Sequence, residues 1–395
     1  MINPFSFTKK EDVIVLDIRD GSVGGMVLSL DKEKKDIPEK KFSIRKEISF
    51  QRDFNHRRLF YATSKALASV ADSISKFGFR LPRKIFCVIG PHLHASQVRV
   101  IKMSYDRPTV ISDDILRSLI FKDIKQFETK HLGINGNSSN IIFEHKIMQI
   151  KLNGYETDSP IKKVASEIEI SVFVSMAPKI LINDIEKIIS NNFHSNKIHF
   201  HSFTFALFDM VRNLSLDRRG FVVINVEGEV TEMSIIRNGA VEDIASFPMG
   251  KNVIIRKIMN RFGVSHDQAI SYLKLFFSNS GEKDITAKMS AIIEQARNFW
   301  SDLFYQALKN ISYHRLLPDS FYLSSEPSCK EVFSNFIKKT DVSGLLVMNK
   351  SPNLDCLEPK VFASLCKNIS ECPDELHFLI DAVFIDKFNK HSYVE

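Results

Sequence analysis

The chain has 395 residues, of which 44% are hydrophobic and 26% charged, and its formal net charge is +7. This length exceeds one ordinary hydrophobic core and predicts two or more domains, while no apolar run reaches the roughly 18 residues that span a bilayer. The N-terminus lacks the apolar core of a signal peptide and the five cysteines lack metal-type spacing, so we expect a cytoplasmic protein with reduced thiols and no metal centre.

The first half of the chain alternates predicted strands and helices. A hairpin comes first, with apolar strands at 13–18 and 25–30 around a polar turn that contains Gly21. Further strands are predicted at 42–50, 84–90, 95–103, 141–152, 166–174 and 197–200, and helices at 61–77, 112–127, 180–193 and 202–213. The stretches 133–139 and 215–219 are rich in turn formers or charge and are expected to be connections.

The second half opens by repeating the first hairpin. Residues 221–238 contain four apolar residues that end in Asn225, a turn with Gly228, and a second apolar strand. Strands follow at 240–247 and 320–324, and helices at about 250–262, from Ser265, at 285–311 and at 330–337; Ser265 with Gln268 makes a capping box. Strands that alternate with helices in both halves predict an α/β fold.

Two such hairpins facing one another would make a phosphate cradle. Backbone N–H groups of the turns would converge on an anion, and a carboxylate at the end of the strand, here Asp17, would hold a hydrated cation. The corresponding position of the second copy is Asn225, whose neutral amide holds a cation less well.

The order of these motifs resembles the actin-like ATPase superfamily, and within it the FtsA family of bacterial cell-division actins, with the pilus-assembly PilM family a close second. The resemblance covers residues 13–369 and lies in VIVLDIRDGSV, FCVIGPHLHASQVRV, ISDDILRSLI, FEHKIMQIKLNGYETDSP, VFVSMAPKILINDIEKII and FVVINVEGEVTEMSIIRN. It implies duplicated ribonuclease H-like domains with a small inserted α+β subdomain. The implied parts are a first domain (1–84 and 175–217), the insertion (85–174), a second domain (218–375) and a C-terminal tail (376–395).

The resemblance also implies where a nucleotide would bind, with ATP and magnesium as the cofactors. The implied phosphate and nucleotide positions are Asp17, Arg19, Gly21, Ser22, Asn225, Gly228, Thr231, Gly250, Lys274, Ser324 and Ser325, with Asp17 as the candidate magnesium ligand. A cap on the turn is the alternative role for Asp17. No catalytic residue is assigned.

The departures from the family pattern lie at these same loops. Arg19 and Asp20 stand where the first loop has glycine and small hydroxyl residues, and Glu227 and Glu229 replace two glycines of the second loop. Two like charges about 4 Å apart cost roughly 4 kcal/mol at an effective dielectric near 20, more than two hydrogen bonds of about 1 kcal/mol each return. Ser324 to Pro327 also replaces the glycine turn on the adenine side. We therefore expect little or no ATP hydrolysis.

The functional expectation is an FtsA-type scaffold that binds division proteins at the inner face of the membrane, with self-association into filaments. A PilM-like scaffold of pilus assembly is the alternative, as is an active ATP-binding member of the superfamily. A sugar kinase and a nucleic-acid-binding module are disfavoured, because no catalytic Asp can be named and the basic clusters lack interleaved aromatic residues.

Three further interpretations concern single elements. The apolar run 376–388 is either a lipid-inserting helix, as in FtsA proteins, or a helix packed on the second domain, which we favour. Glu232 is interpreted as a solvated hairpin residue rather than an acidic site residue. The histidines have no evident carboxylate partner and are assigned to the surface or to packing: His92, His94, His194, His199 and His201.

Overall fold

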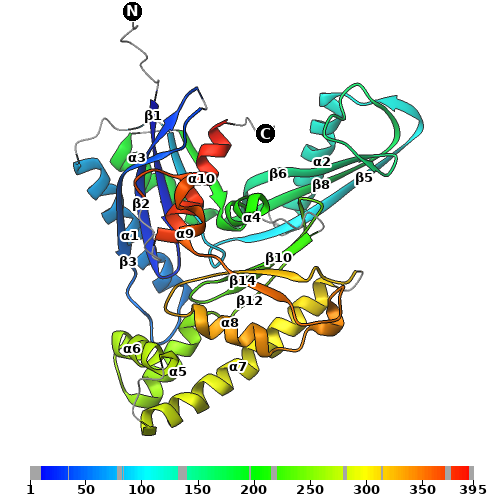
Figure 1. Ribbon diagram of the computed structural model, residues 1–395. Coiled ribbons are helices and arrows are strands. Elements are labelled where there is room, and N and C mark those ends of the chain that lie inside the picture. The colour runs from blue at the N-terminus through cyan, green and yellow to red at the C-terminus, as the bar shows by residue number, and fades with distance from the viewer. Residues whose placement is uncertain are drawn as a thin grey trace, which may run out of the picture.

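The computed structural model describes residues 10–33, 35–77, 82, 84–131, 140–194, 197–214, 220–278, 283–312, 315–369 and 375–390. Three sheets organise the chain: β3-β2-β1-β4-β9, β12-β11-β10-β13-β14 and β5-β8-β6-β7 (Figure 1). The predicted connections 133–139 and 215–219, and Cys372, lie outside the described residues.

The first sheet contains the first hairpin. Its strands are β1 (Lys10–Ile18), β2 (Ser22–Asp31), β3 (Glu39–Glu47), β4 (Lys84–Ile89) and β9 (Lys197–Ser202). Helices α1 (His56–Lys76) and α3 (Lys179–Phe193) pack on each other and contribute to one core with this sheet. Gly25 of β2 lets α1 approach closely, since a Cβ there would meet Val70 at 2.5 Å.

The second sheet repeats the arrangement. Its strands are β10 (Gly220–Val226), β11 (Thr231–Arg237), β12 (Ala240–Phe247), β13 (Ser320–Ser325) and β14 (Asn353–Cys356). Helices α5 (Lys251–Phe262), α6 (His266–Phe277), α7 (Lys283–Ile311) and α8 (Lys330–Lys339) form its core, and Trp300 is fully buried there. In both sheets the hairpin pairs antiparallel and its first strand pairs parallel with a later strand.

The third sheet projects from the first, to the right in Figure 1. It contains β5 (Ala95–Val110), β6 (Asn140–Leu152), β7 (Tyr155–Glu156) and β8 (Val164–Pro178), and α2 (Asp113–His131) packs against it. All its strands come from the range predicted for the insertion or continue just past it. The exact subdomain boundaries stay a prediction.

The C-terminal helix α10 (Leu376–Lys390) lies against the first sheet (Figure 1). It packs on α4 (Phe203–Leu214), β1 and β2. Gly24 allows this approach, because a Cβ there would come within 2.5 Å of the Phe378 ring. The expected packing on the second domain is therefore confined to residues 357–369, and the helix packs mainly on elements of the first domain. The short helix α9 (Pro359–Phe362) and two 3₁₀ turns, Ser343–Leu345 and Ala363–Leu365, complete the described elements.

The element types follow the sequence pattern, and the differences lie at the ends. Helix α1 begins at His56, five residues before the predicted start, because Asn55 caps it by accepting a hydrogen bond from the backbone N–H of Arg58. Strand β5 runs on to Val110 because β8 continues to pair with it beyond an irregularity at Ser104. Pro178 ends β8 as well as preceding α3.

Candidate functional site

The two hairpin turns face each other, and Arg19 of the first reaches the second. The guanidinium of Arg19 donates from Nε to Asp17 Oδ1 at 2.6 Å and from Nη1 to Glu227 Oε1. It also stacks on the Phe203 ring, 3.4 Å from the centroid. All three charged side chains are buried. The positive charge of Arg19 is therefore neutralised by carboxylates from both halves of the molecule.

Both carboxylate oxygens of Asp17 are engaged by guanidinium groups. Besides the bond from Arg19, Arg45 of β3 donates from Nη2 to Oδ2 at 2.7 Å and from Nη1 to Ser22 Oγ at 2.9 Å. Burial alone would raise the pKa of Asp17, but the charges of Arg19 and Arg45 hold that pKa well below its usual value. With two cations on its oxygens, Asp17 does not fit the magnesium role that the resemblance implies. No cluster of three or more potential metal ligands occurs among the described residues.

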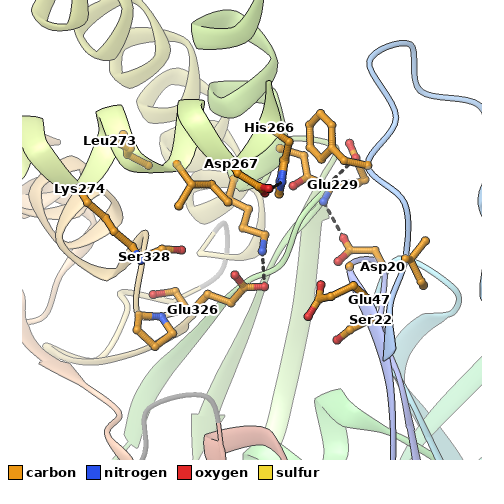
Figure 2. A pocket seen from close by; sticks show the side chains of 18 of the residues that line it. Asp20, Ser22, Glu47, Glu229, His266, Asp267, Leu273, Lys274, Glu326 and Ser328 are labelled. Carbon is orange, nitrogen blue, oxygen red and sulfur yellow. Dashed lines mark hydrogen bonds and ion pairs between the residues drawn. The ribbon is translucent and has the colours of Figure 1, made fainter. Parts of the chain in front are cut away.

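Asp20, next in the first turn, crosses to the second turn (Figure 2). Its Oδ2 accepts the backbone N–H of Glu229 at 2.7 Å. Gly228 permits this approach, because a Cβ there would lie 2.7 Å from the same oxygen. Burial raises the pKa of Asp20 to about 6. A carboxylate of the protein thus occupies the place beside a turn amide where a bound anion would lie.

The N-terminus of α5 is also satisfied from within. The backbone N–H of Lys251 donates to Glu227 O at 3.0 Å, and that of Asn252 donates to Gly228 O at 2.8 Å. Gly250 makes this contact possible, since its Cβ would lie 2.2 Å from Glu227 O. N–H groups at a helix N-terminus can bind an anion. Here the N–H groups of Lys251 and Asn252 already have backbone acceptors.

The Glu229 side chain pairs with residues of the second half, to which it belongs. Its carboxylate accepts from Arg256 of α5 at 2.6 and 2.9 Å and from Asn252 Nδ2 at 2.8 Å. Glu229 lines a cleft of about 1360 Å³ between the two halves. The charge that replaces a glycine of the second loop is thus held by a cation on the following helix.

Other predicted site residues line this cleft or lie behind it. Gly21, Ser22, Lys274 and Ser325 line it, and so does Lys251, which pairs with Glu326 (Figure 2). Six carboxylates line the cleft against three arginine or lysine side chains. Ser324 is buried behind the wall, and its hydroxyl has no hydrogen-bond partner among the described residues. Acidic side chains thus outnumber basic ones around the cleft, and this excess of negative charge is unfavourable for binding a polyphosphate.

Glu232 and Thr231 are interior residues. Glu232 is 5% exposed and accepts a 2.5 Å hydrogen bond from Thr204 Oγ1, so the interpretation as a solvated residue was wrong. Burial raises its pKa to about 7. The Thr231 hydroxyl donates to Met249 O at 2.7 Å and accepts from Trp300 Nε1 at 3.1 Å. These contacts hold β11 to its neighbours inside the second half. Residues directly opposite each other on antiparallel strands point to the same face of the sheet. Glu232 is paired with the buried Asn225 and so faces the interior with it.

Sequence reasoning missed the contribution of α10 to this region. Asp381 is buried and His377 half-buried near the Asp17 and Arg19 pair, and neither oxygen of Asp381 has a hydrogen-bond partner among the described residues. Burial, with the negative charge of Asp17 next, raises the pKa of Asp381 well above its usual value. The sequence offered one sign of this contribution: Asp381 is an acidic residue within the otherwise apolar run 376–388.

The histidines divide into two groups. His94 is buried and His92 is half-buried with both ring nitrogens inaccessible, and desolvation lowers the pKa of each to about 3, which fits the packing assignment. His201 has a carboxylate partner that the sequence did not reveal: its Nδ1 lies 2.9 Å from Glu144 Oε1. The same glutamate accepts from the Ser202 hydroxyl at 2.6 Å, so this cluster joins β6 to β9.

Comparisons with known proteins identify the fold. No protein-family model matches the chain, and no curated protein is similar to it. Among solved structures, the PilM-PilN type IV pilus biogenesis complex matches with a TM-score of 0.63 at 12% identity, over 96% of this chain and 98% of that one. The chain has the actin-like fold.

Two further solved structures match the chain over most of its length with lower TM-scores. The ethanolamine utilization protein EutJ from Carboxydothermus hydrogenoformans has a TM-score of 0.45 at 10% identity, covering 97% and 92% of the two chains. MreB 5 of Spiroplasma citri, bound to AMPPNP, has a TM-score of 0.41 at 9% identity, covering 96% and 97%. Within the described part of this actin-like chain, no helix is long and apolar enough to cross a membrane.

Proposed function

We propose that this chain is an actin-like scaffold that binds protein partners without binding or hydrolysing a nucleotide. The observation that carries the proposal is the pairing of the two turns with each other. Arg19 lies between Asp17 and Glu227, and Asp20 accepts the Glu229 amide, so the groups that would hold phosphate and magnesium already have partners inside the protein. Replacing these contacts would expose buried charges, which is costly.

Among scaffold roles, a PilM-like role in pilus assembly is better supported than an FtsA-like role in division. The similarity to PilM extends over almost the whole of both chains. Helix α10, the candidate membrane anchor of an FtsA-like protein, has its apolar residues buried in the core: Leu376, Phe378, Leu379, Ile380, Val383 and Phe384. A helix used in this way has no apolar face left for lipid.

Calorimetry with ATP and Mg²⁺ tests the nucleotide part of the proposal. We expect no binding heat at millimolar nucleotide for the unmodified chain. The informative control is Asp17→Ala: micromolar binding by the unmodified protein that this variant loses would overturn the proposal. It would also make Arg19 a phosphate ligand.

Binding of a partner tests the scaffold part. A PilN-like protein titrated into this chain should bind with the same affinity in the presence and absence of ATP and Mg²⁺. A nucleotide-dependent affinity, or no binding at all, would contradict a PilM-like role.

A further inference from the structure

We propose that the contacts between the two turns act as an internal clasp, which holds the two halves at a fixed separation across the cleft without a ligand. The inference rests on the proposed nucleotide independence, because it assigns to side chains the bridging that a nucleotide would provide. The clasp is defined here as two contacts: the Arg19–Glu227 ion pair, and the hydrogen bond from the Glu229 amide to Asp20.

The clasp joins elements that are far apart in sequence. Arg19 and Asp20 belong to the turn of the first sheet, and Glu227 and Glu229 to the turn of the second, about 208 residues away. The Arg19 and Glu227 side chains are 3% and 6% exposed, so water screens their attraction little. A charge-assisted contact in such a place is stronger than one at a surface.

Other polar contacts also join the two halves. The hydroxyl of Thr204 in α4 donates to Glu232 Oε1 at 2.5 Å in the interior, whereas the contacts at the rim of the cleft are weaker. Arg52 donates to Val264 O, and Arg256 donates to Gln51 O, each at the 3.5 Å limit of a hydrogen bond. The Phe50 ring lies 4.4 Å from that of His266 at the rim. Since these rim contacts are long or exposed, they add less to the polar attraction between the halves than the clasp and the buried Thr204–Glu232 hydrogen bond do.

The geometry of each turn fits the other closely. Gly228 leaves room for the Asp20 carboxylate, and a side chain there would also meet Asn252 Nδ2 at 2.5 Å. Asn225 Nδ2 donates to Glu227 Oε1 at 3.1 Å, which fixes that carboxylate toward Arg19. The second turn is thus shaped to receive Arg19 and Asp20, and the chain's own side chains set the separation of the two halves.

Distance measurement between spin labels in the full chain tests the clasp. Spin labels are attached at Lys65→Cys of α1, in the first half, and at Ser271→Cys of α6, in the second half, so that they report the distance between the halves. Cys356 and Cys372 are replaced by serine so that they take up no label. Both labelled positions are exposed. We expect a narrow distance distribution for the chain without ligand. Arg19→Ala combined with Asp20→Ala should lengthen the mean distance and broaden the distribution.

Two further variants separate the clasp from general loss of structure. Arg45→Ala removes a partner of Asp17 within the first half and should leave the distribution narrow. Asp20→Ala breaks no ion pair and is expected to fold, with a smaller broadening, while Asp20→Asn keeps an acceptor and should restore the narrow distribution. An unchanged distribution in both the double variant and Asp20→Ala would overturn the clasp. A shift caused by ATP and Mg²⁺ in the unmodified chain would instead overturn the proposed function.

Discussion

The two hairpin turns share a backbone plan and differ in charge. Each follows a buried strand with the same pairing pattern, β1 with β2 and β10 with β11. The first turn presents a cation and an acid, Arg19 and Asp20, whereas the second presents the Glu227 carboxylate and the backbone N–H of Glu229 that bind them. The charges of the two turns are therefore complementary, and each turn binds the other in place of an anion.

The largest effect is expected from removing the shared cation. Arg19→Ala leaves the buried carboxylates of Asp17 and Glu227 facing one another, and breaking such a pair costs about 3 to 5 kcal/mol of unfolding free energy. Urea denaturation measures it. Lys330→Ala is the matched control, since its pair with Glu358 is partly exposed and contributes about 1 kcal/mol or less. Equal losses for the two variants would contradict the buried network.

A pH-dependent effect is expected from the buried acid of the second hairpin. The pKa of Glu232 is raised from its usual value to about 7, so the folded state holds a proton that the unfolded state releases above pH 4.5. Its contribution therefore lowers stability progressively from about pH 4.5 to pH 7. Glu232→Gln should stabilise the protein at pH 8 by roughly 3 kcal/mol relative to its effect at pH 4.5, at 1.36 kcal/mol per pKa unit.

Urea denaturation at both pH values checks this expectation. Glu169→Gln is the contrasting variant, because lysine partners lower the pKa of that glutamate and its substitution should give no stabilisation at high pH. A pH-independent effect of Glu232→Gln would mean that this acid titrates normally.

The smallest effect concerns the glycines of the two turns. Gly228→Ala should cost about 1 to 2 kcal/mol, since its Cβ would crowd Asp20 and Asn252. Gly21→Ala should change stability by less than about 0.5 kcal/mol, because no atom lies within 4 Å of its Cβ. Thermal melting of the two variants side by side gives the comparison. Equal costs would show that the second turn is not tightly fitted.

Much of the architecture could be predicted because strand and helix periodicity is local. The paired hairpins, the inserted strands and the fold class all follow from short apolar patterns. The charge network could not, since Arg45 of β3 reaches Asp17 of β1 across the strand between them and Asp381 comes from α10, far along the sequence. Glu232 was misinterpreted for the same reason: a polar residue on a strand gives no sign of what covers it.

Helix α10 has a consequence for how the protein is made. Residues 376–390 complete the core of the first sheet, whose strands β1 and β2 are synthesised long before them. The part of this sheet that α10 covers therefore stays uncovered on the ribosome until residues 376–390 have emerged. The last step in packing this core during synthesis is the docking of α10.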